Sequence, residues 1–305
     1  MIDCHTHLQP HGEAPPMTLA RIEEYVRVAQ SRGVERVCIT EHLFRFEEAY
    51  TMLHGWWDDD PDATLAGMVD QYWQDHVSGS VTDYVRVIEE AKRAGLPVLL
   101  GLEMDWIRGR EDILRKFLAP YDWDIVLGSV HYIGSWGFDD DRFLDEWTRR
   151  DVVTAWGEYA SLVRDLAASG LADVLSHPDL PKVYGHRPPD ETPLHDAILA
   201  GARATGTAIE LNSNGIRRCR EIYPAMPLLL RARAYDLPIT LASDAHRPER
   251  VGAHFGDLIA WARAAGYEGA SFFEGRKRRS YALPEAEGGM ASEQREGEQQ
   301  TSLGH

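Results

Sequence analysis

The stretch PITLASDAH (residues 238–246) is an apolar run that ends in an aspartate and a histidine two residues apart. The chain begins in a similar way, with MIDCHTH (residues 1–7), in which Asp3, His5 and His7 alternate. Residues two apart in a β-strand project from the same face of the sheet. Each run therefore predicts a strand whose end presents side chains that can bind a metal ion.

Five further apolar runs have the length of strands, and amphipathic helical patterns lie between them. They are RVCITEH (36–42), PVLLGLEMD (97–105), DIVLGSVH (124–131), ADVLSH (172–177) and TAIELNSN (207–214). Strands that alternate with helices are typical of α/β proteins. About seven strand–helix units of this size, with no linker between them, predict one domain built as a parallel barrel.

Some segments do not follow this alternation. Residues 45–80, which contain Trp56, Trp57 and Trp73, are too long for a plain connection between a strand and a helix. Long ordered loops over a barrel mouth are often lids or specificity elements, and the alternative is an insertion packed by its own aromatic side chains. The basic run GRKRRS at 275–280 is expected to end the last helix.

Two helices have clear start signals in the sequence, whereas the last residues of the chain show no pattern of a helix or a strand. Thr18 and Thr82 are suitable N-caps for the helices that follow them. The last residues are rich in Glu, Gln, Gly and Ser and lack periodicity. We therefore expect a barrel domain over residues 1–282 and a disordered tail over residues 283–305.

The composition excludes several classes of protein. A net charge of −17 argues against a general polyanion binder, because phosphate-backbone affinity needs clustered Lys and Arg. The three cysteines, Cys4, Cys38 and Cys219, are too few and too widely spaced for a disulfide framework. No apolar run has the roughly 18 residues needed to cross a bilayer, and no signal peptide is recognisable. We expect a cytoplasmic protein with no nucleic-acid or membrane partner; the sequence leaves its oligomeric state open.

The ends of six of the seven predicted strands carry His, Asp or Glu. In a parallel barrel the carboxyl ends of all strands lie on one rim, where active sites are found. His and carboxylate ligands without cysteine suit zinc, manganese or iron. The candidate ligands are too many for one ion and predict two or three divalent ions: His5, His7, His11, His42, Glu103, His131, His177, Asp244 and His246.

An ordered series of motifs resembles the polymerase and histidinol phosphatase (PHP) family, and within it the monofunctional histidinol-phosphate phosphatases. The motifs are DCHTH, TEH, GLEMD, GSVHYIGSWGFD, SHPDLPK, ELNSNGIR followed by EIYP, and SDAH, and the resemblance runs from residue 3 to about residue 280. It implies a distorted seven-stranded (β/α) barrel with three metal ions at the carboxyl ends of the strands. It also implies hydrolysis of L-histidinol phosphate to L-histidinol and phosphate, a step of histidine biosynthesis.

The resemblance implies how the ligands are shared among the ions. His5, His7, Glu103 and Asp244 would hold the first ion, Glu103 would bridge to a second ion on His131 and His177, and His11, His42 and His246 would hold the third. The chain departs from the family at His11, because only LQP separates this histidine from the HTH motif. The expected catalytic residues are Asp244 and His246, acting with a hydroxide held by the ions.

Substrate binding is expected at the end of the sixth predicted strand, which carries no proposed ligand. Gly215 permits a tight turn or a close backbone approach. Arg217 is expected to bind two oxygens of the substrate phosphate through its guanidinium group. Asn212 is expected to orient the site. The open alternative is that Arg217, Arg218 and Arg220 form a solvated basic face.

Four other functions are weighed against this one. A nuclease or polymerase-associated member of the same superfamily would bind polyanions, and the net charge of −17 argues against such substrates. The same ligands would also serve a phosphoesterase that acts on another small phosphoester or a nucleotide. An amidohydrolase with two metal ions would need a lysine at a strand end, and none of Lys92, Lys116, Lys182 and Lys277 is placed there. A metal-dependent binding module without catalysis would be expected to have lost some of the ligands.

Overall fold

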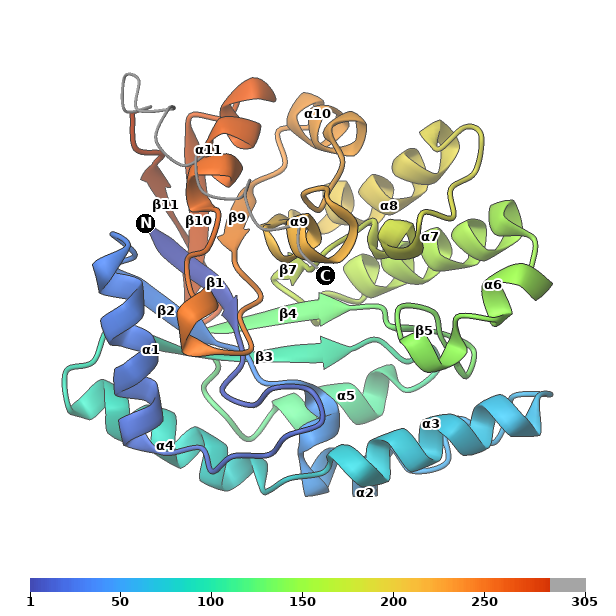
Figure 1. Ribbon diagram of the computed structural model, residues 1–305, viewed down its shortest axis with the longest axis horizontal. Helices are drawn as coiled ribbons and strands as arrows, with labels where there is room; N and C mark the ends of the chain where they lie inside the picture. Colours follow the sequence, from blue (N-terminus) through green and yellow to red (C-terminus); the bar gives the residue numbers. More distant parts are fainter. Residues whose placement is uncertain (286–305) are drawn as a thin grey trace, which may run out of the picture.

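The computed structural model describes residues 1–285, in which a seven-stranded parallel sheet lies at the centre and helices surround it (Figure 1). The strand order is β1-β2-β3-β4-β7-β8-β9. These strands correspond to the seven runs predicted from the sequence: β1 (Ile2–Thr6), β2 (Arg36–Ile39), β3 (Val98–Asp105), β4 (Ile125–Ser129), β7 (Val174–Leu175), β8 (Ala208–Asn212) and β9 (Ile239–Ala242).

The two edges of the sheet meet just beyond the end of β9. The amide of Asp244 donates to the carbonyl of His5 at 2.9 Å, and the amide of His7 donates to the carbonyl of Ala245 at 2.8 Å. Thr6 and Ala245 thereby form a parallel bridge. The sheet is nearly closed into a barrel, which confirms the predicted distorted seven-stranded (β/α) fold.

Helices connect the strands and cover the outside of the sheet (Figure 1). The N-cap predicted at Thr18 is confirmed, because its hydroxyl accepts a hydrogen bond from the amide of Arg21 at 3.3 Å. The N-cap predicted at Thr82 is wrong: Ser80 has extended backbone and caps the helix, and Thr82 lies in its first turn. The helices of the barrel are α1 (Leu19–Ser31), α4 (Val81–Arg93), α5 (Glu111–Leu118), α6 (Glu146–Arg149), α7 (Val152–Ser169), α8 (Thr192–Thr205), α9 (Asn214–Cys219), α10 (Met226–Ala234) and α11 (Phe255–Ala264), with short 3-10 turns η2 (Asp141–Phe143), η3 (Leu180–Tyr184) and η4 (Pro248–Arg250).

The basic run at 275–280 belongs to a hairpin, so its predicted place at the end of a helix is wrong. Strands β10 (Gly269–Glu274) and β11 (Lys277–Ala282) pair antiparallel. The hairpin turn is fixed at the amino end of β4, where the amides of Gly275 and Arg276 donate to Asp124 at 3.0 and 2.9 Å. The side chain of Phe273 closes this end of the barrel by packing on an apolar layer from the strands: Ile2, Cys4, Cys38, Leu99, Ile125, Leu127, Val174 and Ala208.

The ordered chain continues slightly past the predicted domain boundary at 282. Leu283 is buried, and its amide donates to the carbonyl of Glu268 at 2.9 Å. From residue 286 on, the tail predicted to be disordered lies outside the described residues. The division of the chain at 282 remains a prediction.

Residues 45–80 form ordered helices beside the barrel mouth. The 3-10 turn η1 (Leu43–Arg45) leads into α2 (Glu47–Leu53) and α3 (Ala63–His76), which lie along one edge of the molecule (Figure 1). The three tryptophans of this insertion are buried, and the Trp73 indole N–H donates to the Tyr132 hydroxyl at 3.3 Å. Tyr132 belongs to the hairpin of β5 (Tyr132–Ile133) and β6 (Trp136–Gly137), so the insertion packs on its own aromatic rings and on the barrel.

Within residues 1–285, no helix combines the length and the apolar character that a bilayer crossing requires.

Candidate metal centre

The predicted ligands lie together at the carboxyl ends of the strands, as expected for a parallel barrel. They come from β1 and the loop after it, from the residues following β2, β4, β7 and β9, and from within β3. Among residues 1–285, three groups of side chains are close enough to hold an ion: His5, His7 and Glu103; Glu103, His131 and His177; and His7, His42 and His246.

The first group contains three of the four side chains predicted for the first ion, and the fourth, Asp244, lies beside it. His5 Nε2 and His7 Nε2 are 2.9 Å apart, and Glu103 Oε2 is 3.4 and 3.5 Å from them. Asp244 Oδ1 lies 3.8 Å from His5 Nε2 and 3.5 Å from His7 Nε2. Two ligand atoms about 2.1 Å from one ion are roughly 3 to 3.5 Å apart, so these spacings fit a shared ion.

The second group uses the other oxygen of Glu103. Glu103 Oε1 lies 3.1 Å from His177 Nε2 and 3.5 Å from His131 Nε2. One oxygen of this carboxylate therefore faces the first group and the other faces the second. This is the arrangement that a bridging ligand requires.

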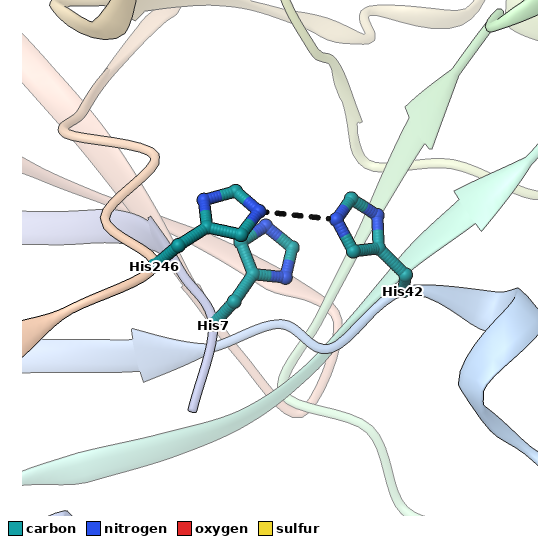
Figure 2. A group of neighbouring side chains, drawn as sticks. All are labelled: His7, His42 and His246. Atoms are coloured by element: carbon teal, nitrogen blue, oxygen red, sulfur yellow. Dashed lines mark hydrogen bonds between the residues drawn. The ribbon is translucent and has the colours of Figure 1, made fainter. Parts of the chain in front are cut away.

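The third group is shown in Figure 2, where the rings of His7, His42 and His246 converge. His42 Nε2 and His246 Nε2 are 3.2 Å apart. The family resemblance implied that His11, His42 and His246 hold the third ion, whereas the structure groups His7 with His42 and His246. The His11 ring lies next to the group, stacked on His246 with the ring centroids 4.4 Å apart, so His11 reaches the centre despite the short loop before it.

Outer carboxylates orient several of these histidines. Glu210 Oε1 lies 2.7 Å from His5 Nδ1, and Asp105 Oδ1 lies 2.7 Å from His131 Nδ1. Because a carboxylate accepts from the ring N–H, each contact leaves Nε2 free to face the cluster, as in most metal-binding histidines. No role was assigned to Glu210 from the sequence. Its position two residues before Asn212, on the same strand face, was the signal that it points toward the site.

Glu41 supports the loop that carries His11. Its Oε1 accepts from the amides of Leu8 and Gln9, at 2.5 and 3.0 Å. Its Oε2 lies 3.8 Å from His7 Nδ1. Glu41 thus connects the end of β2 to the turn after β1 and helps to place two of the histidines.

Buried polar atoms without partners indicate that these side chains suit an ion. Among the described residues, Glu103 Oε2 and His42 Nδ1 are buried and make no hydrogen bond. Glu103 Oε2 and His42 Nδ1 are only 2.5 Å apart, yet their angles do not form a hydrogen bond. Leaving such atoms unpaired is costly, and a cation would satisfy them. A donor set of imidazoles and carboxylates fits zinc, manganese or iron.

The electrostatics hold Glu103, His42 and His246 in the forms that bind metal, whereas burial alone would lower the pKa of His5, His7 and His131 and the neighbouring carboxylates raise it. Burial alone would raise the pKa of Glu103, but the nearby His42 and His5 lower it well below its usual value. Burial, together with the neighbouring His7, lowers the pKa of His42 well below its ordinary value and that of His246 to about 3. The carboxylate is therefore ionised and these two imidazoles are neutral, as metal ligands must be.

Two of the predicted ligands have backbone conformations that non-glycine residues rarely adopt. His177 has φ 29° and Asp244 has φ 52°. Non-glycine residues with positive φ cost of order 1 kcal/mol or more and concentrate at functional sites. The surrounding contacts hold Asp244 in place, since Asn212 Nδ2 and Asn214 Nδ2 donate to its Oδ2 at 3.3 and 3.1 Å.

Two sequence expectations about nearby residues need correction. Asp3 does not join the cluster, although it was placed on one face with His5 and His7. Its carboxylate accepts from the amides of Ser243 and Gly252, both at 2.9 Å, because the pairing of β1 shifts between Asp3 and Thr6. The Ser243 hydroxyl also donates to this carboxylate. Strand alternation would direct Ser176 outward, but Ser176 lies inside and contacts Ser129, which donates to Glu103 at 2.7 Å.

A cavity of about 590 Å³ opens above the cluster and is bordered by ligands and by arginines. Arg217 lines it, with its guanidinium held by Asn214 Oδ1 at 2.8 and 3.0 Å. Arg218, Arg247 and Arg250 also line the cavity. Asn212 is buried beneath the cavity. Its side chain donates to Glu210 and Asp244 and does not line the cavity.

The close approach predicted at Gly215 is confirmed. A Cβ at this position would lie 2.2 Å from the carbonyl oxygen of Glu221 and 2.8 Å from the ring of Tyr223. Only glycine fits there. The contact holds α9, with Arg217, against the segment that carries Tyr223.

Lys182 has no place in the metal centre. It is buried, and its Nζ donates to Asp179 Oδ2 at 2.8 Å and to the carbonyl of Ile222 at 2.7 Å. The Lys182 ammonium group thus forms a structural ion pair and is not available to bridge metal ions. This agrees with the sequence argument against a lysine-bridged amidohydrolase centre.

Comparison with known proteins places this arrangement in a family. Residues 3–214 match the PHP domain. A protein of Deinococcus radiodurans named "Probable histidinol-phosphatase" is 34% identical over 271 residues, which cover 88% of this chain and 94% of that protein. The crystal structure of histidinol phosphate phosphatase from Lactococcus lactis subsp. lactis Il1403, complexed with zinc, L-histidinol and phosphate, has a TM-score of 0.68 and 20% identity over 91% of this chain and 98% of that one. The chain belongs to the PHP domain family.

Proposed function

We propose that the protein is a metal-dependent phosphomonoesterase that hydrolyses L-histidinol phosphate to L-histidinol and phosphate. The observation that carries the proposal is the position of Glu103, whose two oxygens face two groups of histidines at the floor of an arginine-lined cavity. The similarity to the Deinococcus protein over most of both chains supports the choice of substrate. The proposed setting is histidine biosynthesis in the cytoplasm.

We further propose that the centre holds two or three divalent transition-metal ions on the nine predicted ligands. Three candidate groups support this number: the first and second share Glu103, and the first and third share His7. Shared ligands let neighbouring ions lie close together. Bound ions would activate a water molecule near neutral pH and offset the charge that develops on the phosphoryl oxygens. Zinc in the Lactococcus complex supports zinc as one candidate, with manganese and iron as the others.

The protein side chains position the phosphate and handle protons. Arg217 is the proposed phosphate anchor, since a guanidinium donates two parallel hydrogen bonds to phosphate oxygens. Asn214 Oδ1 pre-orients it through two hydrogen bonds. No serine or cysteine nucleophile is required in such a reaction.

Asp244 and His246 are the proposed catalytic pair. Asp244 Oδ2 is fixed by two amide groups, whereas Oδ1 faces the cluster, 3.5 Å from His246 Nδ1. The carboxylate stays ionised, because nearby His5 overcomes the effect of burial and keeps its pKa well below the usual value, and an ionised carboxylate can accept a hydrogen bond from the attacking water. His246 borders the cavity beside it and completes the pair.

Phosphate release from a panel of substrates tests the proposal. The purified protein, supplied with Mn²⁺ or Zn²⁺, is assayed with L-histidinol phosphate, a nucleoside monophosphate, a phosphodiester and an amide. We expect the highest kcat/KM with L-histidinol phosphate. A higher value with the nucleotide or the phosphodiester would contradict the assigned substrate, and turnover of the amide alone would contradict the reaction class.

A further inference from the structure

One wall of the cavity is built by the inserted helices and by the loop that begins after β6, and the proposed chemistry does not use it. Tyr72 and His76 of α3 line the cavity, as do Phe44 of η1 and Asp139 of the loop. None of these residues belongs to a candidate metal group among residues 1–285. This wall contacts the centre directly, because Phe44 stacks on His42 with the ring centroids 4.6 Å apart and the planes 17° apart.

The aromatic part of the wall is continuous. The Tyr72 and His76 rings are 3.9 Å apart, and the Phe44 ring is 5.2 Å from Tyr72. The His76 ring is held in place because its Nδ1 lies 2.7 Å from the Tyr72 carbonyl. The Arg142 guanidinium carbon lies 4.5 Å from the Tyr72 ring centroid, so this part of the wall offers aromatic rings and a guanidinium plane against which a planar group can pack.

Asp139 supplies the charged part of this wall. Its backbone carbonyl accepts from the Tyr184 hydroxyl at 2.8 Å and from the Arg218 guanidinium at 2.7 Å, so two neighbouring elements fix the position of this residue. Within the part of the chain that the structure describes, no hydrogen bond or ion pair occupies the Asp139 carboxylate. The adjacent Asp140 differs, since Arg142 binds both of its oxygens.

Asp139 is half-buried and lines the same cavity as His131 of the metal centre and Tyr72 of the insertion. A fixed carboxylate in a partly desolvated cavity favours a cationic partner.

We propose that Asp139 and the rings of Tyr72 and His76 form the subsite for the alcohol part of the phosphoester, and that Asp139 selects an alcohol with a positively charged amino group. The inference rests on the proposed phosphomonoesterase function and adds the residue that distinguishes amine-bearing from neutral phosphoesters. The ammonium group pairs with the carboxylate, and the planar ring of the alcohol packs on the aromatic wall.

Two substrates that differ only in the amino group test this assignment. The metal-loaded full-length protein and its Asp139→Asn variant are assayed with L-histidinol phosphate and with imidazolylpropyl phosphate, which lacks the amine. The ratio of the two kcat/KM values should favour the amine-bearing substrate in the parent protein. In Asp139→Asn this ratio should fall about 10- to 100-fold, as expected for loss of a hydrogen bond to a charged group, and the change should appear mainly in KM.

The Asp145→Asn variant is the matched control, because Asp145 is exposed, lies in the same segment and does not line the cavity. It changes the net charge by the same amount and should leave the ratio unaltered. An equal loss on both substrates in Asp139→Asn would overturn the assignment, and so would an unchanged ratio. If the parent protein hydrolysed a different class of phosphoester and neither of these two, the proposed function itself would be wrong.

Discussion

Replacement of Glu103 by glutamine should disturb two metal ions at once. The substitution preserves the volume of the buried side chain and removes its charge. Glu103 is the carboxylate in two of the three candidate groups, and its oxygens lie 3.1 to 3.5 Å from the Nε2 atoms of four histidines: His5, His7, His131 and His177. The group of His7, His42 and His246 contains no carboxylate, so its ion should be retained.

The size of the effect follows from the number of lost bonds. Changes to outer carboxylates cost about 10- to 100-fold in metal affinity, so loss of a direct ligand should cost at least about 100-fold for each of two ions. That corresponds to about 3 kcal/mol per ion. Phosphatase activity should fall below about one per cent of the parent value, because both ions contribute to the reaction.

Elemental analysis and metal titration measure this effect. The protein is purified without chelator, its metal content per chain is determined, and the apoprotein is titrated with Mn²⁺ or Zn²⁺. Glu210→Gln is the matched control: Glu210 is an equally buried glutamate whose Oε1 contacts the ring of one predicted ligand, His5, and whose Oε2 accepts from the backbone amide of His177. It should weaken one ion by about 10- to 100-fold. If Glu103→Gln bound the full complement of ions with the affinity of the parent, the bridging role would be refuted.

Three further outcomes are expected. Arg217→Ala should lower kcat/KM by about 100-fold with unchanged metal content. Arg220 is exposed and lies outside the cavity, so Arg220→Ala should leave kcat/KM unchanged. Equal losses in the two variants would indicate a general basic face. Lys182→Met should reduce the free energy of unfolding by about 3 to 5 kcal/mol, because it leaves Asp179 buried and unpaired; denaturant titration measures this, and adding Asp179→Asn should restore part of the loss. Equilibrium dialysis at falling pH should show metal release as the imidazoles gain protons; unchanged metal content in acid would contradict a histidine-based centre.

The strand ends were predictable because two simple regularities coincide. Apolar runs that end in His, Asp or Glu mark both the strand and its carboxyl end, and a parallel barrel brings those ends together. The strand ends therefore predicted that Glu103, His131 and His177 gather at one rim, the resemblance to the PHP family implied that they share an ion, and the structure places the three side chains together. The assignment of these residues as ligands remains a prediction.

The supporting interactions were not predictable from the sequence. Glu210 and Asp105 contact ligand histidines through their outer nitrogens, and such contacts depend on ring orientation, which strand alternation does not determine. Asp3 was misplaced because alternation assumes a regular strand, and the register of β1 shifts at that point. The β10–β11 hairpin was missed because its basic residues resemble the end of a helix; its stability comes from contacts with Asp124 and the barrel floor, which are distant in the sequence.

A metal titration followed by activity tests the central claim most directly. Apoprotein is titrated with Mn²⁺ or Zn²⁺ while phosphate release from L-histidinol phosphate is recorded. We predict no hydrolysis by the apoprotein and full activity only after two to three equivalents have bound, because the ligands form adjoining groups that share Glu103 and His7. Full activity in the presence of a chelator, or after a single equivalent, would contradict a multinuclear phosphatase centre.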